Sequence, residues 1–257
     1  MSHYIDLNSD LGESFGNYTL GMDSEVLNHV TSANVACGWH AGDPLIMEAT
    51  VRMCKEKGVA VGAHPGYPDL MGFGRRAMAV NPGEAKAYMT YQLGALQAFC
   101  DSYGVTLQHM KLHGAFYNTA CVTPALADAV LDGLQAVNPN IAAMVLSGSY
   151  IAKEAQRRGI PVIQEVFADR GYTDEGTLVP RTEPGAFIKD PQEALERVLM
   201  MVKEGKVVTN TGNTIDIVAD SICVHGDNPE AIAFTKYIRE GLAKAGVTVA
   251  NFQDRKK

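Results

Sequence analysis

The chain has 257 residues, of which 46% are hydrophobic and 20% charged, and its formal net charge is -7. These values are typical of a globular protein, and the acidic balance argues against binding to nucleic acid, which needs clustered Lys and Arg. The five cysteines are scattered without a C-x-x-C pair, and the N-terminus lacks the pattern of a signal peptide, so we expect a cytoplasmic protein without disulfides. No apolar stretch reaches the ~18 residues of a membrane span.

Short runs typical of β-strands alternate along the chain with segments of helical character. The predicted strands cover residues 4–7, 32–36, 59–63, 108–112, 143–146, 162–167, 221–224 and 247–251. Five helices are predicted to begin with a capping residue followed by proline, at Asp43-Pro44, Asn81-Pro82, Thr123-Pro124, Asp190-Pro191 and Asn228-Pro229. This alternation favours a parallel sheet, either closed into a (β/α) barrel or open and doubly wound.

The first predicted strand and the residues after it carry oxygen-bearing side chains on one face. Side chains alternate along a strand, so Asp6, Asn8 and Asp10 share a face. In a barrel, helices cover the outer face, so we expect the polar trio to point inward. Asp6 and Asn8 would then support the site, while Asp10 and Glu13, at the open end, would touch substrate.

Residues 207–220 differ from the rest of the chain. Two short runs flank residues 210–213 and predict a β-hairpin inserted before the last main strand. No linker or shift in composition marks a domain boundary, so residues 1–257 are expected to form a single barrel domain. The basic run at 255–257 is interpreted as a solvated tail.

Reactive side chains gather where the predicted strands end, which is where parallel barrels and open sheets place their functional groups. In chain order these side chains are Asp10, Glu13, Trp39, His40, His64, Asp69, Lys111, His113, Asn118, Glu165, Asp169, Arg170, Tyr172, His225 and Asp227. A single histidine at such a position is more often a hydrogen-bonded core residue than a functional one. The prediction of a functional site therefore depends on the repeated pattern and on no single residue.

Two kinds of chemistry suit these side chains. His40, His64 and an acid such as Asp10 are candidates to bind a divalent metal, because two imidazoles and a carboxylate leave positions open for water. Alternatively, the acids and histidines act as general acids and bases at a carbonyl or amide, with Lys111 or Arg170 stabilising negative charge. The spacing of the residues does not decide between the two.

Some of these residues also have purely structural interpretations. Lys111 is compatible with an ion pair inside the barrel, to Asp6 or to Glu165. Cys37 lies near His40, which permits thiolate catalysis, but a small buried thiol is the favoured interpretation.

The segment GFGRRA, residues 72–77, matches a dinucleotide-binding pattern but does not lead into a helix, so that function is rejected. Its Arg75 and Arg76 are interpreted either as a lid that clamps an anionic substrate or as part of a solvated loop. The sequence has no P-loop for ATP and no G-x-S-x-G nucleophile elbow.

Six segments resemble the signature segments of the LamB/YcsF family in the same order, and the resemblance runs from residue 4 to about residue 245. The segments are DLNSDLGESFG, NVACGWHAGDP, VGAHPGYPDLMGFGRR, KLHGAFYN, EVFADRGYTDEGTLVPR and ICVHGDNP. One departure is Ser9, where many relatives are expected to have Cys or Ala. The resemblance implies a distorted seven-stranded (β/α) barrel of the glycoside hydrolase/deacetylase type.

The resemblance also implies an activity, namely the opening of the lactam ring of 5-oxo-L-proline (pyroglutamate) to L-glutamate. This reaction is coupled to hydrolysis of ATP to ADP and phosphate, in a complex with 5-oxoprolinase subunits B and C. ATP is thus expected as a cosubstrate of the complex. Whether a divalent metal binds is left open, as is the formation of homo-oligomers.

On this basis we expect Asp10 or His64 to assist the attack of water. Lys111, His113 and Arg170 are expected to stabilise oxyanion or phosphate charge. The residues expected to contact substrate are Asp6, Asn8, Glu13, His40, Arg75, Glu165, His225 and Asp227. Two alternatives remain, a stand-alone metal-dependent amidohydrolase or carbohydrate deacetylase, and a non-enzymatic subunit that delivers substrate.

Overall fold

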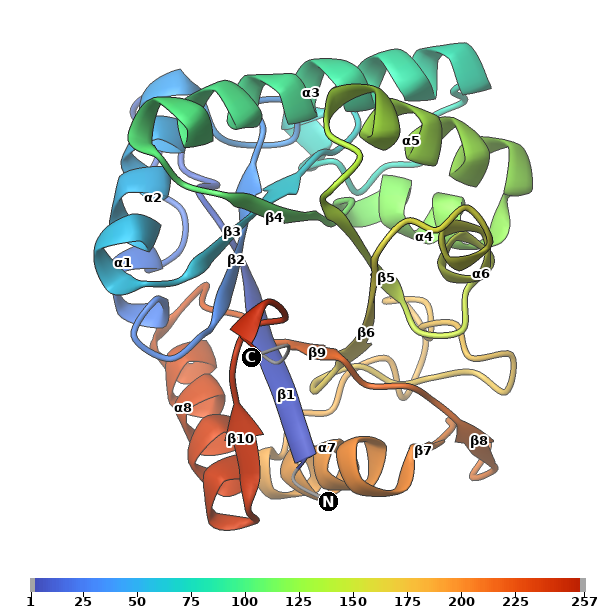
Figure 1. Cartoon of the computed structure of the whole chain (residues 1–257). Coiled ribbons are helices and arrows are strands. Elements are labelled where there is room, and N and C mark those ends of the chain that lie inside the picture. The colour runs from blue at the N-terminus through green and yellow to red at the C-terminus, as the bar shows by residue number, and fades with distance from the viewer. Residues whose placement is uncertain (1–2, 255–257) are drawn as a thin grey trace.

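The computed structural model describes residues 3–254 of the chain, so the basic run at 255–257 lies outside the described residues. Within residues 3–254, parallel strands follow one another in the order β1-β2-β3-β4-β5-β6-β9, and β9 pairs back onto β1 (Figure 1). The chain therefore forms a closed α/β barrel of seven parallel strands. This confirms the predicted fold class and excludes the open sheet.

The barrel strands are β1 (His3–Leu11), β2 (Ser32–Ala36), β3 (Ala60–His64), β4 (Leu107–Met110), β5 (Ala142–Leu146), β6 (Val162–Phe167) and β9 (Ser221–Cys223). An eighth parallel strand, β10 (Val247–Val249), pairs with the first half of β1 outside the closed ring. The helices are α1 (Asp23–Val26), α2 (Pro44–Lys57), α3 (Pro82–Tyr103), α4 (Gly114–Val122), α5 (Pro124–Val137), α6 (Tyr150–Arg157), α7 (Pro191–Glu204) and α8 (Pro229–Lys244). They surround the barrel (Figure 1).

Five helices begin as predicted, with a capping residue followed by proline in the first turn. They are α2, α3, α5, α7 and α8. The side chains of Asp43, Asn81, Asp190 and Asn228 accept hydrogen bonds from backbone N–H groups of the first turn, which otherwise have no partner. Thr123 makes no such side-chain bond.

Three helices were not predicted, α1, α4 and α6, which lack proline in their first turn. The first strand is longer than the predicted 4–7, because β1 continues through Leu11. Asn8 and Asp10 have low intrinsic preference for strands, but their pairing inside the barrel overrides it.

One pair of strands lies apart from the seven-stranded barrel. The hairpin predicted over 207–220 corresponds to the antiparallel pair β7 (Lys206–Val208) and β8 (Thr214–Asp216). Among the described residues, no single helix is long and apolar enough to cross a membrane, and the pair α4–α5, bent by 115°, meets that test by length and composition alone.

The two faces of the barrel strands differ in polarity. Apolar side chains such as Ile5, Leu7 and Val61 are fully buried and belong to the large hydrophobic core. The alternate positions of β1, beginning with Asp6, form a polar network inside the barrel that leads up to the candidate site.

Candidate active site

Asp6 and Asn8 form the floor of the site. Oδ1 of Asp6 accepts hydrogen bonds from the hydroxyls of Thr31 and Ser32 at 2.6 and 2.7 Å, and Ser221 donates to Oδ2. Nδ2 of Asn8 donates to Ser221 Oγ at 2.8 Å. Because both side chains are fully buried and hydrogen-bonded, they support the groups above them and do not reach a ligand.

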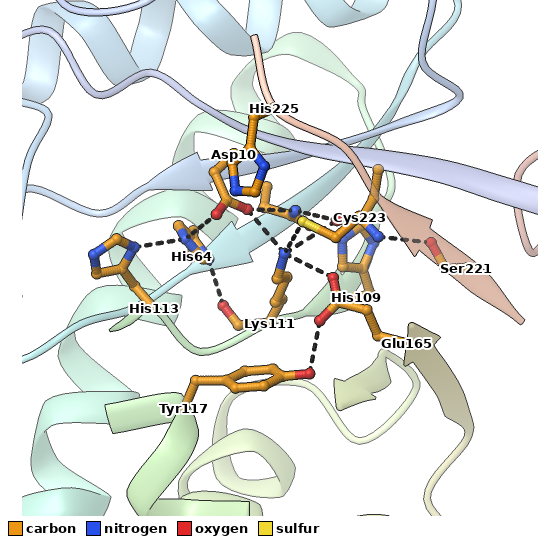
Figure 2. A network of polar contacts seen from close by, with 12 residues as sticks. Asp10, His64, His109, Lys111, His113, Tyr117, Glu165, Ser221, Cys223 and His225 are labelled. Carbon is orange, nitrogen blue, oxygen red and sulfur yellow. Dashed lines mark hydrogen bonds and ion pairs between the residues drawn. The ribbon is translucent and has the colours of Figure 1, made fainter. Parts of the chain in front are cut away.

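Lys111, directly after β4, is the cation at the centre of the barrel interior (Figure 2). Its Nζ lies 2.7 Å from Glu165 Oε1, 3.0 Å from Asp10 Oδ1, 3.1 Å from Asn8 Oδ1 and 3.2 Å from Cys223 Sγ. Burial alone would lower the pKa of Lys111, but the two carboxylates raise it well above its ordinary value. Lys111 is therefore an ammonium ion held between two acids.

Asp10 joins Lys111 to a group of histidines (Figure 2). Its Oδ1 accepts hydrogen bonds from Lys111 Nζ at 3.0 Å and from Asn34 Nδ2 at 2.8 Å, and its Oδ2 lies 3.2 Å from His64 Nε2. Burial alone would raise the pKa of Asp10, but His64 and Lys111 hold it well below its usual range. Its side chain is 21% exposed, so an ionised carboxylate faces the cavity.

Three histidine rings meet beside Asp10. His40 follows β2, His64 ends β3 and His113 immediately precedes α4. The rings of His40 and His113 are stacked with their centroids 3.7 Å apart, and the ring of His64 is perpendicular to both. One ligand atom from each ring and one from Glu13 lie within 4.8 Å of one another, an arrangement able to hold a metal ion.

The protonation of this group follows from its burial. Burial lowers the pKa of His40 well below its ordinary value and that of His113 to about 3. Burial, together with the charge of Asp10, raises the pKa of Glu13. His40 and His113 are thus neutral imidazoles, the form in which histidine binds metals.

Glycines make room for these rings. A Cβ at Gly66 would lie 2.7 Å from His40 Nδ1, and a Cβ at Gly74 would lie 2.8 Å from both His40 Cβ and His113 Cδ2. Gly74 also has a φ of +62°, which favours glycine. The second glycine of GFGRRA therefore allows the histidines to pack closely.

A cavity of about 130 Å³ opens at this end of the barrel. Its lining includes the acids Asp10, Glu13 and Asp227. Arg75 and Lys111 supply positive charge to the same lining. Opposite charges thus face a space that suits a small molecule better than a polymer.

The two arginines of GFGRRA have different positions. Arg75 lines the cavity, with its guanidinium carbon 4.9 Å from the centroid of the Phe73 ring. Arg76 pairs with Asp69, whose carboxylate also accepts a hydrogen bond from the backbone N–H of Gly72 at 3.0 Å. Arg75 is thus placed to meet a ligand, while Arg76 fixes the loop that presents it.

Two further arginines come from the long connection between β6 and α7. Arg170 donates to the backbone carbonyls of Ala186 and Val179 at 2.9 and 2.6 Å, so it ties this connection together as well as lining the cavity. Arg181 lines the cavity too, and the guanidinium groups of both arginines lie over the ring of Phe187.

His225 forms an ion pair with Asp169 at the edge of the cavity. The distance from His225 Nδ1 to Asp169 Oδ2 is 2.9 Å. Burial alone would lower the pKa of His225, but Asp169 raises it above its ordinary value. His225 is therefore able to carry a proton close to where substrate would bind.

Most of the predicted site residues lie together. The cavity is lined by Asp10, Glu13, His64, Arg75, Lys111, His113, Arg170, His225 and Asp227. Asp6, Asn8, His40 and Glu165 lie behind that lining and are fully buried. Lys111 pairs with Glu165, which is one of its two predicted partners, and with Asp10. The other predicted partner, Asp6, accepts hydrogen bonds from hydroxyl groups.

Several groups in and beside the cavity were not predicted from the sequence. Tyr117 lines the cavity and donates to Glu165 Oε2 at 2.7 Å, and Arg181 comes from a segment with no strand or helix. The tyrosine lies four residues beyond His113 and thus at a helical spacing from it, a signal that would have found it. Arg181 carries no such local signal.

Cys37 is not suited to thiolate catalysis. Its side chain is buried, and burial raises the pKa of the thiol to about 12. The thiol is therefore protonated at neutral pH, in agreement with the structural interpretation of this residue.

Comparison with known proteins shows extensive similarity. The model of the LamB/YcsF family matches residues 5–257. The 5-oxoprolinase A subunit of Fusobacterium nucleatum is 60% identical over 254 residues, with 99% of both chains covered. The corresponding A subunit of Pyrococcus abyssi is 54% identical, and the match covers 97% of this chain and 98% of that one. The crystal structure of the lactam utilization protein of Thermus thermophilus superposes with a TM-score of 0.91 at 45% identity, covering 97% of this chain and 100% of that one.

Proposed function

The chain belongs to the LamB/YcsF family, and from this premise we propose that it is one of the subunits of an ATP-dependent 5-oxoprolinase. The reaction is the opening of the lactam ring of 5-oxo-L-proline to L-glutamate. The names of similar proteins, which are 5-oxoprolinase A subunits and a lactam utilization protein, support this proposal. The observation that carries it is the ionised Asp10 beside the Lys111 ammonium at the floor of a small cavity.

The cavity suits an anionic cyclic amide. 5-Oxoproline carries one carboxylate, and Arg75 and Arg181 supply guanidinium groups to the lining from two different loops. A guanidinium binds a carboxylate through two parallel hydrogen bonds. We assign carboxylate binding to these arginines, and this leaves the ring amide to point towards Asp10 and Lys111.

Hydrolysis of a lactam needs a positioned water, a group that stabilises the oxyanion and a proton for the leaving nitrogen. In our proposal Asp10 accepts a proton from the water as it attacks the carbonyl carbon. The ammonium of Lys111 stabilises the negative charge that develops on the carbonyl oxygen. His225, kept protonated by Asp169, donates a proton to the ring nitrogen.

In this proposal, the use of ATP depends on the partner subunits. The sequence has no P-loop, so we assign phosphoryl transfer to the complex with 5-oxoprolinase subunits B and C. This chain would then receive the phosphorylated, more anionic species, which the cations of the cavity suit, and hydrolysis of that species would release phosphate together with L-glutamate. A cytoplasmic location follows, because ATP is available there.

A stand-alone metal-dependent amidohydrolase is the second candidate. The group formed by Glu13, His40, His64 and His113 favours it, since imidazoles and a carboxylate are the ligands of catalytic zinc. The two functions differ in their need for ATP and partners. Lactam opening by the isolated chain without ATP would favour the amidohydrolase.

The decisive experiment is the conversion of 5-oxoproline to glutamate by this chain with and without ATP and its B and C partners. We expect turnover only with all components. Asp10→Asn and Lys111→Met should each lower turnover roughly 10²-fold or more. Asp216→Asn, an exposed acid in the hairpin, is the matched control. Wild-type turnover in both site variants would refute these catalytic roles.

A further inference from the structure

His64 and His113 have their protons fixed by backbone carbonyls. Nδ1 of His64 lies 2.8 Å from the carbonyl oxygen of Lys111, and Nε2 of His113 lies 2.8 Å from that of Phe73. A carbonyl oxygen only accepts hydrogen bonds, so each of these nitrogens carries the N–H of its ring. Where such a ring carries no second proton, its opposite nitrogen, Nε2 in His64 or Nδ1 in His113, presents a lone pair.

Those two lone pairs point at each other. Nε2 of His64 and Nδ1 of His113 lie 2.9 Å apart, and the rings are perpendicular (Figure 2). Two unprotonated nitrogens at this distance repel each other, unless a proton or a metal ion lies between or beside them. Both rings are at least 95% buried, so water does not relieve the repulsion.

The surrounding charges favour a divalent cation over a single proton. Asp10 Oδ2 lies 3.2 Å from His64 Nε2, and Glu13 Oε1 lies 3.7 Å from His113 Nδ1. Lys111 pairs with both Asp10 and Glu165, so its single charge leaves one of those carboxylates unbalanced, and the carboxylate of Glu13 is a second. A proton on one ring would balance only one of these two charges. A divalent ion would balance both and would accept the two nitrogen lone pairs as well.

We propose that His64 Nε2, His113 Nδ1 and the carboxylate of Glu13 bind a divalent transition metal of the zinc class. Neutral imidazoles and a carboxylate are the ligands that this class prefers. The anchoring of each imidazole N–H by a carbonyl is the usual outer support of a metal-binding histidine. All three residues line the cavity, so the remaining coordination positions face substrate.

His40 supports this site from behind. Its Nε2 lies 3.1 Å from Glu13 Oε1, and its ring is stacked on that of His113. Stacked rings direct their in-plane lone pairs side by side and do not converge on one ion, so we assign His40 to orienting Glu13. The sequence paired His40 with His64 as ligands, whereas the geometry favours His113 in place of His40.

The site is tested by metal binding in protein without an affinity tag, freed of metal by chelation and dialysis. Co²⁺ is the probe, because its visible absorption reports imidazole and carboxylate ligands, and Zn²⁺ is then titrated in competition. We expect one equivalent of Co²⁺ to bind and to be displaced by Zn²⁺. His64→Gln and His113→Gln should abolish the spectrum, and His40→Gln should weaken binding ~10–100-fold, as for other outer partners.

His225→Gln is the matched control, since His225 lines the same cavity outside the proposed ligands. It should bind Co²⁺ like the wild type. Thermal unfolding shows whether each variant folds, and Zn²⁺ should raise the melting temperature of the wild type but not of the ligand variants. The proposal fails if the wild type binds no Co²⁺, or if the ligand variants bind it equally well.

A proton between the rings is the competing explanation, and ¹⁵N NMR of the histidines distinguishes it. An imidazolium at His64 or His113 at pH 7 that persists when Zn²⁺ is added would overturn the metal site. None of these measurements requires turnover, so they test the metal site independently of the proposed 5-oxoprolinase activity.

Discussion

Ser9 and Ser32 are buried serines with opposite surroundings. The hydroxyl of Ser32 donates to Asp6 Oδ1 at 2.7 Å, whereas that of Ser9 has no hydrogen-bond partner among the described residues. Ser9 lies on the alternate positions of β1, away from Asp10. A buried hydroxyl without a partner destabilises the folded state, because it loses its bonds to water.

We therefore expect Ser9→Ala to raise the free energy of unfolding by about 1 kcal/mol. Ser32→Ala should lower it by a similar amount, because it leaves Asp6 with one donor fewer. Denaturation in urea measures both. A loss of stability in Ser9→Ala would show that its hydroxyl has a partner after all.

Arg75 and Arg76 are adjacent in sequence but differ in role, so they make a matched pair. If Arg75 binds the substrate carboxylate, Arg75→Gln removes a charge-assisted hydrogen bond worth ~1.5–3 kcal/mol. We expect KM for 5-oxoproline to rise at least tenfold. Arg76→Gln, which breaks the pair with Asp69, should change KM less and loosen the loop. Equal KM values for the two variants would contradict this division.

At the scale of single residues, the sequence predicted the site well wherever the pattern is local. Strand alternation alone places Asp6, Asn8 and Asp10 on one face, and the helices that cover the outside of a barrel make that face the inner one. Of the partners of Lys111, Glu165 was one of two predicted alternatives, but Asp10 was not predicted. The partners come from β1, β6 and β9, whose relative heights in the barrel depend on strand register.

Gly62 on β3 and His109 on β4 are in close contact. A Cβ added at Gly62 would lie 2.1 Å from Nε2 of His109, so the imidazole occupies the space above the glycine. The same Nε2 donates to Asn34 Oδ1 at 2.7 Å. The absence of a side chain at position 62 therefore allows the polar interior to form.

Gly62→Ala should lower the free energy of unfolding by about 3 kcal/mol, because neither the strand backbone nor the buried ring has room to move. The double variant Gly62→Ala/His109→Ser removes the clash and should be more stable than the sum of the two single changes predicts. Strict additivity in thermal or urea unfolding would exclude a direct contact.

Whether a helix was predicted from the sequence depended on the residues at its N-terminus. Helices that begin with a cap and proline were found, since both residues act within one turn. Helix α4 begins directly after the cavity residue His113, with Gly114 at its first position, so its start is set by the site and not by a local signal. Helix α6 has a serine cap but no proline, and this weaker signal was not recognised.

The stability of the whole molecule should depend on pH through His109. Burial lowers the pKa of this side chain to about 3 from an ordinary value of 6.5. Below pH 6.5 the unfolded chain therefore binds a proton that the folded protein does not. The stability that this neutral histidine contributes is present above pH 6.5 and is lost as the pH falls towards 3.

We expect this residue to contribute about 1.4 kcal/mol per pH unit to the fall in unfolding free energy between roughly pH 6 and pH 4. His109→Gln keeps a donor for Asn34 but does not titrate, so its stability should fall less steeply by that amount. Urea unfolding at several pH values measures both slopes. Parallel slopes would mean that folded His109 also takes up the proton.

The strand and helix pattern predicted the closed barrel only as one of two architectures, and its closure was expected from the family resemblance alone. Alternation of strands and helices predicts parallel pairing between neighbours in sequence. Whether the last strand returns to the first depends on twist and stagger accumulated over all strands, which no local pattern contains. The extra strand β10, which pairs with β1 outside the ring, is a further long-range outcome.

The pairing of β1 with β9 also sets the order of events during synthesis. Asp6 and Asn8 pair with Ser221 and Cys223, so the first strand to leave the ribosome must wait for residues made more than two hundred positions later. Until then β1 has an open edge, and Asn8 lacks its hydrogen-bond partner Ser221. The lining of the cavity, which includes His225 and Asp227 after β9, is thus complete only as the barrel closes.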